Sequence, residues 1–136
     1  MKVTRRASRE IAFSLLFEFL IKGDEPAEEI WDNAVEFPTL KSGPYTMEVF
    51  YGCTRNLEKL NEIIEPCLLG WKKERVSYVS RAVIMIATYE MLFIEDVPYK
   101  VAIDEAITLS KKYEGGKTYS FVNGVLNAVA ESLSLK

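Results

Sequence analysis

The sequence contains no histidine, and this absence excludes many kinds of catalytic and metal site. Without imidazole there is no Ser–His–Asp or Cys–His nucleophile system, no HExxH zinc site and no histidine general base. A glycine-rich phosphate loop is also missing, since Gly115 and Gly116 form a lone pair between two helical patterns, as in a turn. We therefore expect a protein that is not an enzyme and that uses neither a cofactor nor a metal.

Cysteines and long apolar runs are scarce as well. Cys53 and Cys67 are fourteen positions apart and form no CxxC pair, so we expect both to be reduced and buried. The longest apolar stretch, 82–94, would span about 20 Å as a helix, short of the ~30 Å of a bilayer core. No signal peptide is recognisable, because the basic start leads directly into an amphipathic segment. These features favour a cytoplasmic protein without a membrane span.

The charge is unevenly distributed along the chain. The whole chain has a formal charge of −3, yet its first ten residues carry +3, which leaves −6 for the rest. Four cations produce this basic start: Lys2, Arg5, Arg6 and Arg9. Such asymmetry indicates a short basic arm for a polyanion on an acidic body. The alternative is a solvated helix start whose cations only keep the protein soluble.

Helical periodicity covers nearly every segment, and glycine and proline fall between the segments. We expect helices at about 4–21, 26–36, 45–69, 77–94, 98–113 and 118–133, with Thr4 and Thr118 as N-caps and Val101 facing inward. The helix at 77–94 is apolar nearly all round and should be central. The predicted fold is all-α, two small helical bundles packed together through this central apolar helix. It forms one domain, 1–136, with halves of about 1–70 and 71–136.

The second half of the chain carries four spaced motifs: Trp71-x3-Arg75, the tetrapeptide at 87–90 (ATYE), the run at 97–106 (VPYKVAIDEA) and the hexapeptide at 121–126 (FVNGVL). Together they resemble the NusB family of bacterial transcription antitermination factors. Their order and gaps are similar to those of the family over essentially the whole chain. We expect most of them to encode the fold, with Trp71 as a core or linker anchor and Gly124 admitting a neighbouring helix backbone. The chain departs from the family where Ser80 replaces an often acidic residue, Met85 an arginine and Asp104 an asparagine.

The resemblance implies a function in RNA binding. The expected ligand is boxA-type single-stranded RNA in nascent ribosomal RNA transcripts, held together with a small ribosomal-subunit protein acting as NusE. Other Nus factors and RNA polymerase would be reached indirectly, and a homodimer is a possible free form. The family's RNA contacts fall on Lys2, Arg5, Arg6, Arg9, Lys117, Ser120 and Phe121, and its partner surface on Phe17 and Ser80. Whether Phe121 stacks on RNA or is a core residue is left open.

Two other functions remain as alternatives. One is a helical protein-interaction scaffold without direct RNA contact. The other is the RNA-binding part of a ribosomal RNA methyltransferase, which would need an appended α/β domain; a stand-alone factor is the preferred reading. If all four cations contact phosphates, RNA affinity should fall about fifty-fold when the salt concentration rises from about 50 to 200 mM. Binding this modest predicts that the acidic body recruits a basic ribosomal protein to complete the RNA site.

Overall fold

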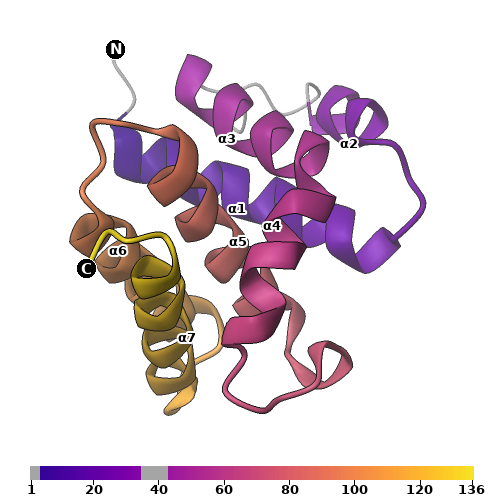
Figure 1. Cartoon of the computed structure of the whole chain (residues 1–136). Helices are drawn as coiled ribbons and strands as arrows, with labels where there is room; N and C mark the ends of the chain where they lie inside the picture. Colours follow the sequence, from indigo (N-terminus) through magenta and orange to yellow (C-terminus); the bar gives the residue numbers. More distant parts are fainter. Residues whose placement is uncertain (1–3, 35–42) are drawn as a thin grey trace. The chain divides into compact units, whose positions relative to one another are not determined.

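The computed structural model describes residues 4–34 and 43–136. Within these residues the chain forms seven α-helices and two short 3-10 helices, and no strand (Figure 1). The all-α prediction is therefore confirmed. The chain divides into two compact units, Met1–Arg55 and Asn56–Lys136, and each is described by itself below.

The first unit contains α1 (Arg5–Lys22), α2 (Ala27–Ala34) and α3 (Pro44–Arg55). As predicted, Thr4 is the N-cap of α1: its hydroxyl oxygen accepts a hydrogen bond from the Ala7 N–H at 3.1 Å. Gly23, with a φ of 75°, ends the same helix. Helix α1 packs against both α2 and α3. The core of the unit consists of apolar side chains from all three helices: Ala12, Phe13, Leu15, Leu16, Ile30, Trp31, Val49, Phe50 and Cys53. The end of α2 predicted near residue 36 lies outside the described residues.

The single helix predicted at 45–69 is wrong. Helix α3 ends at Arg55, α4 runs from Leu57 to Ile64, and the 3-10 helix η2 (Glu65–Cys67) follows. Asn56 leaves the helical conformation, with a φ of −114° and a ψ of 23°. Periodicity hid this break because the buried positions Cys53, Leu60 and Ile64 keep helical spacing across it. Helix α4 packs on α5 and α7, so it belongs to the second unit.

The second unit is built around α5 (Tyr78–Phe93), which packs against α4, α6 (Tyr99–Tyr113) and α7 (Thr118–Ser132) (Figure 1). Residues 82–90 of α5 are all buried, as expected for a helix that is apolar nearly all round. The N-cap of α5 is Ser77, whose hydroxyl oxygen accepts a hydrogen bond from the Ser80 N–H at 3.1 Å. Gly115 and Gly116, both with positive φ, make the turn from α6 into α7.

Three local predictions in the second unit are wrong. Val101 is 44% exposed, not inward-facing. Thr118 is the first residue of α7 rather than its cap, and Lys117, at the N-cap position, makes no side-chain cap bond. A Cβ on Gly124 would lie 2.9 Å from Cδ1 of Leu69, so a side chain, not a helix backbone, approaches this glycine. None of the helices in the described residues combines the length and the apolar character that crossing a membrane requires.

Candidate functional site

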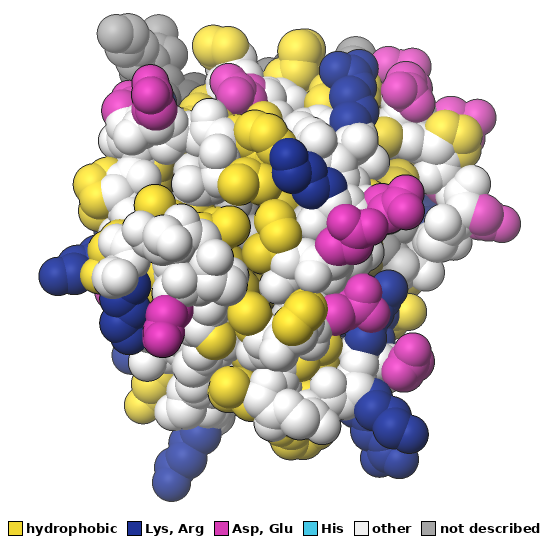
Figure 2. All heavy atoms as spheres, in the orientation of Figure 1, with side chains coloured by type: hydrophobic (Ala, Val, Ile, Leu, Met, Phe, Trp, Pro, Cys, Tyr) yellow, Lys and Arg dark blue, Asp and Glu magenta, His cyan; other side chains and the backbone are white. Residues whose placement is uncertain are grey.

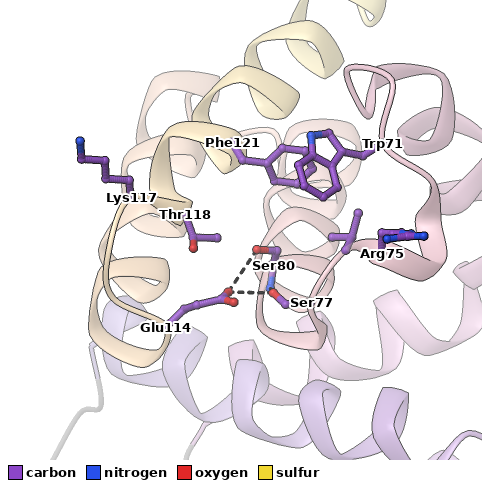
Figure 3. Close-up of a pocket in the computed structure, with 9 residues that line it drawn as sticks. Trp71, Arg75, Ser77, Ser80, Glu114, Lys117, Thr118 and Phe121 are labelled. Atoms are coloured by element: carbon purple, nitrogen blue, oxygen red, sulfur yellow. Dashed lines mark hydrogen bonds between the residues drawn. The ribbon is translucent and has the colours of Figure 1, made fainter.

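The second unit contains a pocket of about 450 Å³ between the segment 71–80 and the start of α7 (Figure 3). It is lined by Trp71, Arg75, Val76, Ser77, Ser80, Glu114, Lys117, Thr118 and Phe121. The rings of Trp71 and Phe121 meet edge to face on one side, with centroids 5.8 Å apart and an interplanar angle of 66°. The Glu114 carboxylate lies across the pocket from these rings (Figure 3). The pocket thus has an aromatic wall and an anionic floor.

The segment that carries Trp71 and Arg75 is fixed by backbone geometry and by α5. Leu69 and Gly70 both have positive φ, 54° and 86°, and turn the chain after η2. Arg81 of α5 then donates from Nε to the Val76 carbonyl at 2.9 Å and from Nη2 to the Lys73 carbonyl at 2.6 Å. These bonds tie the 3-10 helix η3 (Lys73–Arg75) to α5. The sequence pattern gave no signal for this role of Arg81, because the acceptors are backbone carbonyls.

Trp71 is 56% exposed, so it is not the core residue that was offered as one of two possibilities, while its role as a linker anchor stays a prediction. Phe121 is half-buried, in contact with Trp71. Lys117 also lines the pocket. It lies four positions before Phe121, so the two side chains are about one helical turn apart on the same side of the start of α7. Ser120 is exposed but does not line the pocket. Of the second predicted contact region, the structure brings together Lys117 and Phe121 and leaves Ser120 outside.

Glu114 is the C-cap of α6, and its Oε1 accepts hydrogen bonds from the hydroxyls of Ser77 at 2.7 Å and Ser80 at 3.3 Å. A carboxylate is unfavourable at the C-terminus of its own helix but favourable at the N-terminus of α5, whose first turn has no acidic residue. Ser80 is only 1% exposed, so its side chain is not on the surface where a partner contact was predicted. Arg75 and Lys117 extend outward on opposite sides (Figure 3). Two cations therefore flank a pocket whose floor is negative.

The predicted basic arm lies at the start of α1 in the first unit, and its arginines differ in exposure to solvent. Arg5 and Arg6 are exposed, whereas Arg9 is only 4% exposed. The guanidinium groups of Arg5 and Arg9 lie over the Tyr45 ring, at 4.5 and 5.9 Å from its centroid. Lys2 lies outside the described residues. The partner candidate Phe17 is partly buried, with its ring 6.1 Å from that of Phe13.

Figure 2 shows Lys and Arg side chains distributed over one face, among acidic and apolar side chains. Within residues 4–34 and 43–136, no group of three His, Cys, Asp or Glu side chains is placed to hold a metal ion. The arrangement suits contact with a few phosphates and one or two bases rather than broad coating by a polyanion.

Comparison with known proteins identifies the class as transcription antitermination factors. The chain belongs to the NusB family, whose family model matches residues 6–131. It is 40% identical over 129 residues to the transcription antitermination protein NusB of Acetivibrio thermocellus, covering 93% of this chain and 88% of that protein. It is 36% identical to the NusB of Bacillus licheniformis, covering 95% and 98%. The NusB family is non-enzymatic, which confirms the expectation that this protein is not an enzyme.

Solved structures show the same fold. NusB of T. maritima has a TM-score of 0.83 and 34% identity, covering 96% of this chain and 93% of that one. A chain from a crystal structure of the antitermination factors NusB and NusE in complex with dsRNA also has a TM-score of 0.83, with 27% identity and coverage of 94% and 96%. The predicted NusB-like fold is therefore confirmed.

Proposed function

We propose that this NusB-family protein binds boxA-type single-stranded RNA of nascent ribosomal RNA transcripts jointly with a small ribosomal-subunit protein acting as NusE. It would thereby promote processive transcription in the cytoplasm, reaching other Nus factors and RNA polymerase indirectly. The observation that carries the proposal is the exposed Trp71 ring in contact with the half-buried Phe121 ring, with Arg75 and Lys117 beside them. Aromatic faces that stack bases, flanked by cations that hold phosphates, are what single-stranded nucleic acid requires.

Two further features support RNA contact. Arg5 and Arg6 are exposed at the start of α1 and supply charge for phosphates. No side chain caps the start of α7, so the positive end of its helix dipole, which attracts anions, lies next to Lys117 without a capping side chain. Arg9, being buried, is assigned to the support of this arm rather than to the RNA. Residues 1–136 would thus act as one RNA-binding domain.

A protein partner is needed because the RNA contacts are few and most of the chain repels RNA. Residues 11–136 carry a net charge of −6. An acidic surface of this kind is complementary to a basic ribosomal protein, which would then complete the RNA site. Phe17 is the proposed surface residue for that partner, and a homodimer of the free protein would compete with it if it covered the same face.

The test is a titration of fluorescent boxA-type RNA with the full chain, alone and with NusE, at about 50 and 200 mM salt. The same RNA annealed to its complement serves as a duplex control. We expect the single strand to bind tightly only when NusE is present. Equal affinity without NusE would refute the shared site, and no binding in either case would leave a protein-interaction scaffold as the function. The double variant R5A/R6A should weaken RNA binding while its melting temperature stays close to that of the wild type.

A further inference from the structure

We propose that the pocket between Trp71 and Glu114 receives one unstacked guanine base of the bound RNA, and that Glu114 selects it. This inference rests on the proposed function and adds to it a base preference and the residue responsible. It follows from three properties of the pocket: its aromatic wall, the unused acceptor capacity of its carboxylate and the cations beside it.

The pocket has the size and the wall that a base needs. Its volume of about 450 Å³ lies within the range of about 300–1,000 Å³ typical of small-molecule sites. Trp71 is 56% exposed and meets Phe121 by an edge-to-face contact, which leaves ring surface uncovered by protein. Stacking on such a surface holds any base. Selection among bases must therefore come from the polar side of the pocket.

Glu114 has acceptor capacity to spare. Its Oε1 accepts two hydrogen bonds, from the Ser77 and Ser80 hydroxyls, and so uses both of its lone pairs. Its Oε2 accepts no hydrogen bond from any residue in the described ranges 4–34 and 43–136. The two serines hold the carboxylate in place (Figure 3), and one anionic oxygen with two lone pairs remains available to a ligand.

An anionic acceptor of this kind matches guanine better than any other base. The Watson–Crick edge of guanine presents two adjacent donors, N1–H and the N2 amino group. Adenine and cytosine place a ring-nitrogen acceptor beside their amino group, and uracil flanks its N3–H with two carbonyl oxygens. An acceptor next to a carboxylate is repelled, whereas adjacent donors form charge-assisted hydrogen bonds. Single-stranded bases are commonly read on this edge.

The two cations favour RNA over a basic protein side chain as the occupant. A lysine or arginine from a partner would also suit an aromatic wall and a carboxylate. Arg75 and Lys117 flank the pocket, however, and would repel such a cation. The same pair attracts the phosphates on either side of an inserted base. The charges thus point to a nucleotide.

The test measures anisotropy of short fluorescent uridine oligomers that carry one central guanosine, inosine, adenosine or uridine, bound by the full chain at about 50 mM salt. Wild type should bind the guanosine oligomer at least about fivefold more tightly than the uridine oligomer. Inosine lacks the N2 amino group and should fall between them. This series uses unaltered protein, so its result does not depend on whether a variant folds.

The variant Glu114→Gln then isolates the carboxylate. Its amide oxygen still accepts from Ser77 and Ser80, but its second atom becomes an NH2 donor facing the guanine donors. We expect E114Q to lose the guanosine preference while it binds the uridine oligomer at least as tightly as wild type. Glu131→Gln removes the same charge at the opposite end of α7 and should keep the preference. Lys117→Ala should weaken all four oligomers alike, because a phosphate contact carries no base information.

The outcomes separate this inference from the proposed function. Equal binding of all four oligomers by wild type would refute the guanine pocket and leave RNA binding intact. A guanosine preference retained by E114Q would also refute it, and would show that Glu114 serves only to bind the two serines at the start of α5. No binding of any oligomer at low salt, either by the chain alone or with NusE present, would overturn RNA binding itself.

Discussion

The salt dependence of RNA binding should distinguish Arg5 and Arg6 from Arg9. The three residues form one cluster in the sequence, yet Arg5 and Arg6 are exposed whereas Arg9 is only 4% exposed. A side chain that neutralises one phosphate of a single strand contributes about −0.7 to the slope of log K against log salt. Arg5→Ala and Arg6→Ala should each reduce the steepness by about this amount. Arg9→Ala should leave the slope unchanged.

The expected salt slope follows from the number of exposed cations that can contact phosphates. Contacts from Arg5, Arg6, Arg75 and Lys117 would give a slope of about −2.8. Each contact then accounts for a change of about 2.6-fold in affinity between about 50 and 200 mM salt. Arg9→Ala instead removes a buried side chain that lies over Tyr45, and should lower the free energy of unfolding by about 1–3 kcal/mol.

The assay is fluorescence anisotropy with boxA-type RNA over a salt series, at a fixed NusE concentration, with urea unfolding measured in parallel. Lys22→Ala is the matched control at the other end of α1. Lys22 lies 2.8 Å from Glu18 and 2.9 Å from Glu25, and hydrogen bonds to these two carboxylates raise its pKa. Its charge is already paired, so the slope should not change. A slope reduced equally in R9A, or unchanged in R5A and R6A, would refute the reasoning.

Two further substitutions test the second unit. Gly124→Ala should stabilise the protein by up to about 1 kcal/mol, because alanine is the better helix former and the obstructing Cδ1 belongs to Leu69, an exposed side chain that can rotate away; a lower melting temperature would show that the space is needed. Trp71→Ala should leave the melting temperature nearly unchanged but weaken RNA binding by about 1–3 kcal/mol. RNA should also quench tryptophan emission in wild type and not in W71A. An RNA affinity of W71A equal to that of wild type would show that the pocket does not contact RNA.

Most of the fold could be predicted because its signals are local. Helices α1, α5 and α6 begin and end close to the predicted positions, since Ser77, Pro98 and the glycine turns mark their limits. The break at Asn56 was missed because helical spacing of buried residues continues through it. A helix break cannot be recognised from the pattern of apolar residues when the buried residues on its two sides remain at helical spacing.

The site was predicted only in part, for two different reasons. The burial of Arg9 had a signal: it lies three positions before Ala12 and seven before Leu16, in line with the buried stripe of α1. The exposure of Trp71 had none, because it depends on a left-handed backbone at Leu69, a conformation that leucine rarely adopts. Large aromatic side chains are usually buried, so the sequence favoured the wrong environment.

Glu114 supplies a negative charge next to position 80 from a distant part of the chain. The sequence resemblance predicted an acidic residue at position 80, where this chain has Ser80. The structure places the Glu114 carboxylate 3.3 Å from the Ser80 hydroxyl, from a helix end thirty-four positions away in the chain. A carboxylate from another helix therefore lies beside residue 80.

This arrangement predicts that the effect of Ser80→Asp changes sign with residue 114. Residue 80 is the third residue of α5, where an acid is favoured by the helix dipole and can form a capping box with Ser77. In wild type the new carboxylate would face Glu114 in a buried site, and S80D should lose about 1–3 kcal/mol of stability. In E114Q the repulsion is absent, so S80D should be neutral or stabilising. Urea unfolding of wild type, S80D, E114Q and the double variant measures the coupling free energy between residues 80 and 114. If the two single-variant changes in unfolding free energy add up to that of the double variant, the two side chains do not interact.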